Sequence, residues 1–553
     1  MPGVFGESVK NSKVQVDVVF WFHGRVSPCV IFEDDHLLVV NKPAGLNTHS
    51  PSQYAGEGLY EWLRNREPRW AALAIIHRLD KDTSGLIIFS KTPLANRSLT
   101  EQFAARKVRK KYVLATDRPV PPKGLIVKTS LKRVGEKYVS RPIHAGSEPA
   151  ETRFGVPALA DNLFWVEAEP ITGRTHQIRV HAAESGFPVL GDTLYGGISA
   201  TRVHLHAAEL AFFHPTSGEK MEFQCSPDFR ADPRLALRTG LIDLNETNAF
   251  RLINGAGDGA PGWYVERLGE FLLSQGEQEL TGAQLKEIER RMHDLGARGL
   301  YHKIRARADR PTSAPNRTLG QAAGERFAIR ENGVQFELSF SEGYSTGLFL
   351  DQRDNRRRLL TGYISPGFCL PAVAKEHETE KLQMLNTFAY TCGFSVCAAK
   401  VGWHTTSIDL SKKYLDWGKR NFLFNQIDPA EHEFLRGDVF DWLARLAKKQ
   451  RRFDLILLDP PTFSASKRSG AFQVQKHYSR LTTAALPLLN RDGVIFASTN
   501  AADWPPQKFL ESVQNAVHSA KRPIIQLQYI PQPPDFPISR GEPAYLKTVW
   551  LKL

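Results

Sequence analysis

The sequence predicts a multidomain protein in which a mixed, β-rich α+β part is followed by a small β-containing module and an α/β part. Three observations support this prediction. The chain has 553 residues, more than one hydrophobic core normally holds. Residues 28–230 form short alternating segments separated by turns, which is typical of β-rich folds. Residues 336–553 alternate apolar strands with amphipathic helices, which indicates a parallel, Rossmann-like sheet.

The domain boundaries are expected at turn-forming segments. Residues 1–27 share no pattern with the rest and are expected to form an N-terminal extension. Prolines and charged residues in 226–233 favour an end of the first domain at about residue 230. The stretch 254–262 holds four glycines and a proline, which favours tight turns in a module spanning 245–335.

Charge and composition restrict the class of protein. The chain has 72 Lys and Arg residues against 59 Asp and Glu residues, a net charge of +13, which favours a nucleic acid over a membrane as partner. It has no run of 18 apolar residues and no signal-peptide pattern, so we expect a cytoplasmic protein without a membrane segment. Its five cysteines show no disulfide or zinc spacing, so we expect no disulfide framework and no metal.

Basic residues gather in three clusters, 106–111, 353–358 and 448–452. A cluster of this kind is more often a solvated face than a binding site. The first cluster adjoins Tyr112, so we assign it to phosphate contacts with RNA. The residues assigned to these contacts are Arg106, Lys107, Arg109, Lys110 and Lys111.

The decapeptide HRLDKDTSGL, residues 77–86, is the most informative stretch of the chain. It places Asp80 between basic residues, after an apolar approach and before an apolar exit. A carboxylate beside a guanidinium stays ionised and oriented, as a catalytic nucleophile or base requires. A lone Arg-x-Asp would instead indicate a surface ion pair at a hairpin turn. The complete decapeptide resembles the active-site motif of the RluA-type pseudouridine synthases, with Asp80 at the catalytic position.

Further segments resemble motifs of the same family in the same order. They are residues 33–46, 109–115, 172–181, 191–197, 205–207 and 213–215. The resemblance implies that Asp80 is the nucleophile or the base that starts glycosidic cleavage. It implies that Arg179 keeps Asp80 ionised through a bidentate contact, and that Tyr112 stacks on the flipped uracil or accepts its carbon-5 proton. Arg78 is expected to touch RNA, and neither a metal nor a cofactor is required.

A second set of motifs lies in the last 220 residues. Residues 384–396 pass from an apolar strand through a small-residue turn into a helix, which lets a nucleotide-like ligand approach the backbone at the sheet edge. The next strand ends in Asp409, the placement for accepting ribose hydroxyls. A buried strand then closes on Asp459 and two prolines.

This series resembles the class I methyltransferases that use S-adenosylmethionine. Residues 342–356 are similar to the group that makes 5-methylcytosine or 7-methylguanine in large-subunit ribosomal RNA, and 245–335 resemble the linker domain of that group. The resemblance implies that Asp459 lies where cofactor and target base meet. It implies a cofactor site lined by Asn386, Phe388, Tyr390, Gly393, Asp409 and Asp438.

The acceptor atom depends on whether a cysteine is in place. Cytosine carbon 5 is a poor nucleophile and needs a cysteine to add to carbon 6 first. The resemblance implies that this cysteine would follow the strand after Asp-Pro-Pro, and the matching residues, 493–500, include none. Cys392 and Cys397 are expected to be packing residues. Residues 462–468 also resemble the 7-methylguanine branch. Guanine N7 is therefore favoured, with 5-methylcytosine as the alternative.

The sequence thus predicts a bifunctional enzyme that makes pseudouridine and methylates large-subunit ribosomal RNA. Two alternatives stay open. The N-terminal half could be a passive RNA-binding module of a methyltransferase, although Asp80, Tyr112 and Arg179 are retained. The whole chain could instead be a non-catalytic ribosome-assembly factor that binds RNA.

Overall fold

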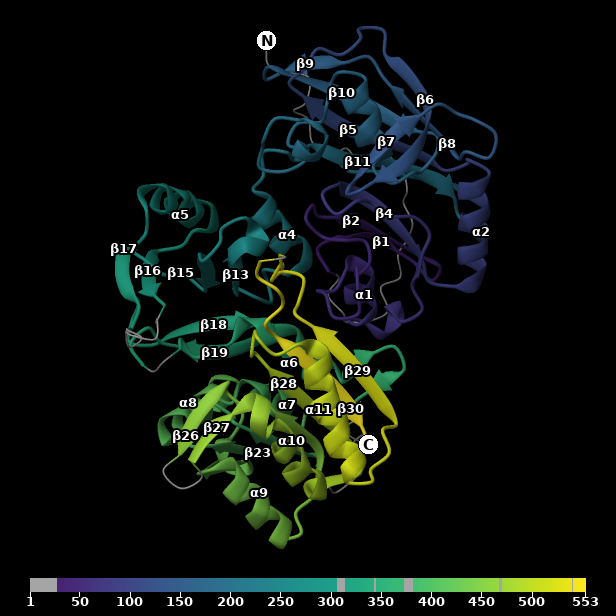
Figure 1. Ribbon diagram of the computed structural model, residues 1–553. Helices are drawn as coiled ribbons and strands as arrows, with labels where there is room; N and C mark the ends of the chain where they lie inside the picture. The colour runs from purple at the N-terminus through teal and green to yellow at the C-terminus, as the bar shows by residue number, and fades with distance from the viewer. Residues whose placement is uncertain (1–26, 306–313, 343–344, 372–380, 467–469, 540) are drawn as a thin grey trace.

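The computed structural model describes residues 27–305, 314–342, 345–371, 381–466, 470–539 and 541–553. The expected extension, residues 1–27, therefore lies outside the described residues except for Ser27. Four residues of the motif segments 342–356 and 462–468 also lie outside them: Gly343, Tyr344, Lys467 and Arg468. Figure 1 shows three parts, which we call the N-terminal part (residues 27–230), the central module (residues 233–338) and the C-terminal part (residues 345–553). Over the described ranges, no helix has the length and apolar character needed to cross a membrane.

The N-terminal part is built on a 12-stranded, mostly antiparallel sheet with the main order β1-β2-β4-β11-β5-β10-β8-β6-β7. Strand β4 is buried along its whole length, because the chain covers both of its faces. The strands are β1 Val30–Glu33, β2 Leu37–Lys42, β3 Ala74–Ile75, β4 Ser84–Ser90, β5 Arg109–Thr116, β6 Leu125–Val134, β7 Lys137–Arg141, β8 Pro149–Phe154, β9 Ala158–Ala160, β10 Leu163–Pro170, β11 Leu205–Phe213 and β12 Lys220–Gln224. The helices are α1 Leu59–Arg64, η1 Pro68–Trp70, α2 Pro93–Ala104, α3 Gln177–Glu184 and η2 Thr193–Tyr195.

The central module holds a five-stranded sheet of order β13-β14-β15-β16-β17 and a separate hairpin, β18-β19. Thr281 begins helix α5 with a capping box, in which its side chain and that of Gln284 each accept from the other's backbone N–H. The elements are α4 Pro233–Leu241, β13 Ala249–Asn254, η3 Gly255–Asp258, β14 Tyr264–Leu268, β15 Phe271–Gly276, α5 Gly282–Leu295, β16 Gly299–Ile304, β17 Asn316–Gly320, β18 Phe327–Glu331 and β19 Val334–Leu338.

The C-terminal part contains the α/β sheet predicted from the alternating pattern, with the order β24-β23-β22-β25-β28-β30-β29. The first five strands are parallel, whereas β30 is antiparallel to both of its neighbours. The strands are β20 Tyr363–Ser365, β21 Phe368–Cys369, β22 Gln383–Thr387, β23 His404–Asp409, β24 Glu433–Arg436, β25 Phe453–Leu458, β26 Phe463–Ser466, β27 Gly470–Gln473, β28 Leu489–Thr499, β29 Gln526–Pro531 and β30 Lys547–Lys552. The helices are η4 Leu350–Gln352, α6 Arg353–Thr361, α7 Gly393–Lys400, α8 Lys412–Phe424, η5 Pro429–Glu431, α9 Val439–Lys448, α10 Val474–Ala485, η6 Leu486–Leu488 and α11 Pro506–Ser519.

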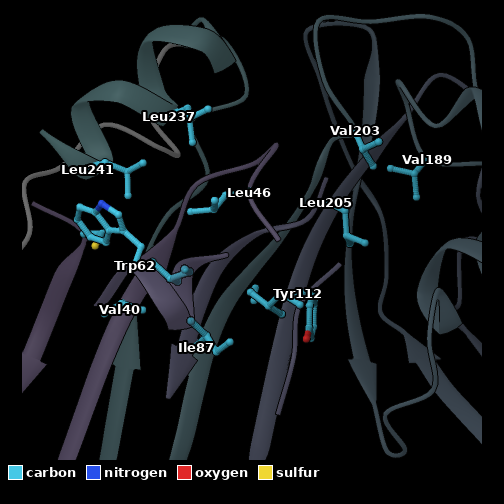
Figure 2. Packing of buried hydrophobic residues seen from close by; sticks show 14 of the residues in the cluster. Val40, Leu46, Trp62, Ile87, Tyr112, Val189, Val203, Leu205, Leu237 and Leu241 are labelled. Carbon is cyan, nitrogen blue, oxygen red and sulfur yellow. The ribbon is translucent and has the colours of Figure 1, made fainter. Parts of the chain in front are cut away.

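The hydrophobic core of the N-terminal part continues into the central module. Figure 2 shows Leu237 and Leu241 of α4 beside Leu46 and Trp62, and all four belong to one buried cluster. The same cluster reaches Leu300 on β16. The segment 226–233 is therefore a turn between two parts that share a core.

The basic cluster 353–358 is not the solvated face that its charge suggests. Arg353 forms a bidentate ion pair with Asp535, with distances of 2.8 and 2.7 Å. Arg356 does the same with Glu331, at 2.6 and 2.8 Å. Arginine tolerates burial when a carboxylate matches its planar fork. That sequence prediction was wrong because the acidic partners are distant in the chain.

Candidate active sites

A cavity of about 530 Å³ opens in the N-terminal part; we call it the Asp80 pocket. Asp80 lies in the loop between β3 and β4, Tyr112 on β5, and Arg179 in the first turn of α3. The structure therefore brings together three residues that are separated by up to 99 positions in the chain, as the motif resemblance predicted. The cavity is lined, among others, by Arg78, Asp80, Arg106, Lys110, Tyr112, His176 and Arg179.

The loop that carries Asp80 is fixed on both sides. The Thr48 hydroxyl donates to the carbonyl of Leu79 at 2.8 Å and lies 3.1 Å from the Leu79 N–H, which donates to it. On the far side, β4 pairs with β11, and a Cβ at Gly85 would lie 2.3 Å from the carbonyl oxygen of Ala207. Gly85 also has a φ of +115°, so only glycine fits there. The loop has little freedom, which favours a carboxylate held in one place.

Arg179 does not make the bidentate contact with Asp80 that the sequence resemblance predicted. Its Nη1 lies 3.9 Å from Asp80 Oδ2. The bidentate partner is Asp192, whose carboxylate accepts from Nε at 2.6 Å and from Nη2 at 2.8 Å. Arg179 and Asp192 are both almost fully buried. Asp192 thus fixes the guanidinium, which then faces Asp80 with its remaining nitrogen.

Tyr112 contributes a neutral ring to the Asp80 pocket. Burial raises the pKa of its phenol, and the negative charge of Asp80 raises it further. A phenol in this setting stays protonated at neutral pH and is a poor proton acceptor. The aromatic face remains available for stacking.

The residues predicted to contact RNA divide into two groups. Arg78, Arg106 and Lys110 line the pocket, and burial lowers the pKa of Lys110 to about 8. Lys107 is exposed outside the lining. Arg109 and Lys111 both pair with Glu209, at 2.7 and 3.2 Å. The positive charge available at the mouth of the pocket is therefore smaller than the sequence cluster suggests.

A larger cavity, of about 770 Å³, lies in the C-terminal part; we call it the Asp459 pocket. It occupies the ends of the parallel strands β22, β23, β25 and β28, the edge at which open α/β sheets bind ligands. The predicted residues that line it are Phe388, Tyr390, Asp409, Asp438 and Asp459. Asn386 and Gly393 do not line it. Asn386 donates to Ser395 Oγ at 2.9 Å inside the protein, and a Cβ at Gly393 would meet Leu348 at 2.9 Å.

The turn between β22 and α7 has an uncommon backbone. Phe388, Tyr390 and Cys392 have φ angles of 55°, 50° and 61°, a region that non-glycine residues adopt at a cost of about 1–3 kcal/mol each. The conformation is held by Asp409 Oδ2, which accepts from the Tyr390 N–H at 2.8 Å, and by Thr391, which donates to Gly347 O at 2.6 Å. The strained turn faces the pocket, as strained segments at ligand sites often do.

Two carboxylates are placed to accept hydrogen bonds from a ligand. Asp409 ends β23 and accepts backbone N–H groups on both oxygens, from Tyr390 and from Ser411, each at 2.8 Å. These bonds orient the carboxylate and leave lone pairs directed at the cavity. Asp438 caps α9 by accepting from the Phe440 N–H at 2.9 Å. Carboxylates at two strand ends suit the hydroxyl and amino groups of a nucleoside, so the site fits S-adenosylmethionine.

Asp459 lies deeper in the same cavity. The side-chain amide of Gln352 donates to its Oδ2 at 3.4 Å and to Ser498 Oγ at 2.8 Å. Burial raises the pKa of Asp459 to about 6, while the hydrogen bonds from Ser498 and Gln352 and the charge of Arg356 oppose that rise and the charge of Asp351 adds to it. Asp459 thus changes charge close to neutral pH.

No cysteine is among the described residues that line the Asp459 pocket. Cys392 and Cys397 are fully buried, and burial raises the pKa of each thiol to about 12. A thiol that stays protonated is a weak nucleophile. Both cysteines act as small packing residues, as the sequence indicated.

Comparisons with known proteins agree with this division into two sites. The RNA pseudouridylate synthase family matches residues 36–184, and the S-adenosylmethionine-dependent methyltransferase family matches residues 294–551. The ribosomal large subunit pseudouridine synthase C of Yersinia pestis is 37% identical over 232 residues, which are 40% of this chain and 72% of that protein.

Two further relatives match the methyltransferase side. The ribosomal RNA large subunit methyltransferase of Deinococcus radiodurans is 30% identical over 340 residues, 59% of this chain and 78% of that protein. The ribosomal RNA large subunit methyltransferase K of Neisseria meningitidis serogroup B is 39% identical over 180 residues, 32% of this chain and 46% of that protein.

The two family matches define an RNA-modifying enzyme with two activities. The chain belongs to the large-subunit ribosomal RNA pseudouridine synthases through its N-terminal part, and to the S-adenosylmethionine-dependent large-subunit ribosomal RNA methyltransferases through the rest. It therefore has both activities, and the non-catalytic assembly factor and the passive N-terminal module are no longer needed as alternatives.

Proposed function

We propose that the Asp80 pocket converts a uridine of large-subunit ribosomal RNA to pseudouridine and that the Asp459 pocket methylates N7 of a guanine in the same class of RNA. The observation that carries the choice of guanine N7 is the absence of a cysteine from the described lining of the Asp459 pocket. We also propose the domain division 28–230, 245–335 and 336–553, with a shared core at its first boundary.

At the Asp80 pocket, the reaction breaks the bond between uracil N1 and the ribose, turns the base and joins carbon 5 to the ribose. N1 gains a proton and carbon 5 loses one, so the product is an isomer of uridine. The Asp80 carboxylate starts the cleavage as nucleophile or base. Arg179 lies 3.9 Å away and fixes the position of that negative charge, itself held by Asp192. Tyr112 stacks on the base and keeps it from leaving, because its raised pKa makes it unsuited to accept the proton.

RNA reaches this pocket with its target base out of the stack. Extruding a base costs a few kcal/mol, and least where the RNA is irregular. Arg78, Arg106 and Lys110 line the pocket and would contact the phosphates beside the extruded nucleotide. Arg109 and Lys111 contribute less, because Glu209 neutralises part of their charge.

At the Asp459 pocket, S-adenosylmethionine supplies a methyl group activated by its sulfonium. Phe388, Tyr390, Asp409 and Asp438 would hold that cofactor. The chain then has to align a guanine so that the N7 lone pair faces the methyl carbon, because positioning is the main contribution to such a displacement. Ionised Asp459 would orient the guanine by accepting from its N–H groups and would stabilise the positive charge that the ring acquires.

Methylation of cytosine carbon 5 would require a thiolate to add to carbon 6. Cys392 and Cys397 are buried away from the pocket, with thiols that remain protonated. Guanine N7 needs no covalent assistance, so the described lining suits it better.

The proposal is tested by incubating the purified protein with S-adenosylmethionine and unmodified ribosomal RNA, then digesting the RNA and separating its nucleosides by liquid chromatography and mass spectrometry. Pseudouridine together with 7-methylguanosine is the expected result. Pseudouridine with 5-methylcytidine would overturn the acceptor assignment while leaving the synthase assignment in place.

A further inference from the structure

Helix α1 of the N-terminal part, the synthase part, lies against helix α6 of the C-terminal part, the methyltransferase part. The indole N–H of Trp62 on α1 donates to Asp354 Oδ2 on α6 at 3.3 Å, and both residues are buried. Just beyond α6, the hydroxyl of Tyr363 donates to the carbonyl of Arg64 at 2.7 Å. The two parts therefore meet through specific hydrogen bonds.

Charged groups extend this contact. Arg357 on α6 donates to the carbonyl of Arg66 at 2.5 Å and forms an ion pair with Glu67. Glu57 is 5% exposed; burial raises its pKa to about 7, and Arg358 opposes that rise. Charged groups that have been taken out of water are costly to separate from their partners. The contact consequently holds α6 in one position.

The N-terminal end of α6 leads directly into the Asp459 pocket. Gln352, the residue before the helix, donates to Ser498 Oγ and Asp459 Oδ2, and its own oxygen accepts from Asn355 Nδ2 at 2.7 Å. Asn355 lies in the first turn of α6, next to Asp354. A displacement of α6 would therefore move Gln352 relative to Asp459.

We infer that Trp62 of the synthase part is a positioning residue for methyl transfer: its hydrogen bond to Asp354 fixes α6, and α6 places Gln352 on Asp459. The synthase part is thereby a structural component of the methyl-transfer site. This inference rests on methyl transfer at the Asp459 pocket and is independent of which base accepts the methyl group.

The test compares two tryptophans in the synthase part. Trp62→Phe keeps an aromatic ring and removes the donor to Asp354. Trp70→Phe is the matched control, because Trp70 is equally buried and its N–H donates at 2.9 Å to Glu33, which lies within the synthase part. Both full-length variants are assayed for labelled methyl groups transferred to ribosomal RNA, whatever the base, and for pseudouridine formed in the same RNA.

Trp62→Phe is expected to lower kcat for methyl transfer about 5- to 20-fold, because α6 loses a hydrogen bond that fixes it. The KM for S-adenosylmethionine and the rate of pseudouridine formation should stay within about twofold of the unmodified enzyme. Trp70→Phe should leave methyl transfer unchanged. The inference is overturned if Trp62→Phe retains methyl transfer within twofold, or if both variants lose it equally.

The pH profile separates positioning from a general loss of stability. The groups that face Asp459 are Asp351 and Gln352 of η4, Arg356 of α6, Ser498 of β28 and Tyr478 of α10. Gln352 lowers the pKa of Asp459, so its displacement should move the acid limb of kcat to higher pH in Trp62→Phe and not in Trp70→Phe. An unshifted limb in Trp62→Phe would contradict the inference.

If Trp62→Phe does not fold, Glu67→Gln provides a second test at the edge of the same contact. It removes the charge that pairs with Arg357, and the expected loss of methyl transfer is two- to fivefold. The control is Glu33→Gln, which removes a similarly buried carboxylate that pairs with Lys91 at 2.8 Å within the synthase part. Equal activities of these two variants would refute the role of the contact.

Discussion

The two pockets use the same side chain in opposite electrostatic settings. Asp80 has a side chain 24% exposed and faces the guanidinium of Arg179. Asp459 is half-buried, faces the neutral amide of Gln352 and lies near a second carboxylate, Asp351. Burial raises the pKa of Asp459 and the charge of Asp351 adds to the rise, whereas Asp80 faces a cation. We therefore expect methyl transfer to depend on the charge state of Asp459, and we expect neutralising substitutions at the two sites to affect different reactions.

Removing the charge at Asp80 should have the largest effect. Asp80→Asn is expected to reduce pseudouridine formation by at least about 10³-fold, because an amide cannot act as nucleophile or base. Methyl transfer by the same variant should stay within about twofold. Both products are measured in one nucleoside digest, and pseudouridine formation that survives would remove Asp80 from the proposed chemistry.

Asp192→Asn tests whether Asp80 depends on Arg179 being held in place by Asp192. It should lower pseudouridine kcat about 10- to 100-fold and the free energy of unfolding by about 3–5 kcal/mol, because a buried arginine loses its counter-charge. Asp258→Asn is the control, since Asp258 holds the buried Arg238 in the same bidentate way, at 2.9 and 2.6 Å, in the central module. If Asp258→Asn loses as much pseudouridine activity as Asp192→Asn, the effect of Asp192→Asn is a loss of stability.

Asp409→Asn should weaken the methyltransferase site alone. An amide has one acceptor oxygen in place of two, so one of the N–H donors from Tyr390 and Ser411 loses its partner. The KM for S-adenosylmethionine is expected to rise about 10- to 30-fold, equivalent to about 1.4–2 kcal/mol. Equilibrium binding of S-adenosylmethionine provides the check, and an unchanged affinity would exclude Asp409 from the cofactor site.

The pH dependence of methyl transfer tests the role of Asp459. The pKa of Asp459 is raised to about 6, so its anionic fraction, and with it methyl transfer, should rise about tenfold between pH 5 and pH 7. The direction follows from the proposed role of the ionised form, which is lost as the pH falls through the pKa. Asp459→Asn should have a low rate of methyl transfer that does not rise between pH 5 and pH 7. If the rise persists in this variant, it comes from the titration of another group.

Changing the cysteines should have the smallest effect. Cys392→Ala and Cys397→Ala are each expected to leave methyl-transfer kcat within about twofold of the unmodified enzyme, because neither thiol reaches the pocket. Single-turnover methylation of ribosomal RNA measures this directly. Complete loss of activity in a folded variant would reopen the 5-methylcytosine alternative.

Local patterns predicted much of the fold, and most of the site residues predicted from them line one of the two pockets. The strand before Asp459 could be read from its apolar run, residues 455–458, because a parallel strand buried on both faces is largely hydrophobic. Asp80, Tyr112 and Arg179 were found through motifs. These features depend on a few neighbouring residues and are therefore visible in one sequence.

Pairings between distant residues could not be predicted in this way. Asp192 lay in a recognised motif, yet only the fold shows that Arg179 pairs with it rather than bidentately with Asp80. The arginines of 353–358 resembled a solvated cluster because Glu331 and Asp535 are separated from them in the chain. Asn386 does not line the Asp459 pocket and donates to Ser395 instead, because a strand–turn motif does not specify which side chains face the cavity.

The contact between Trp62 and Asp354 also sets an order of events during protein synthesis. The two residues are 292 positions apart, so at about 5–20 residues per second α1 emerges from the ribosome roughly 15–60 s before α6 exists. Throughout that interval the indole of Trp62 has no acceptor from α6, and the surface around it remains uncovered. The nascent synthase part must stay free of wrong partners until the last third of the chain arrives, so slow translation beyond residue 230 would expose it to aggregation for longer.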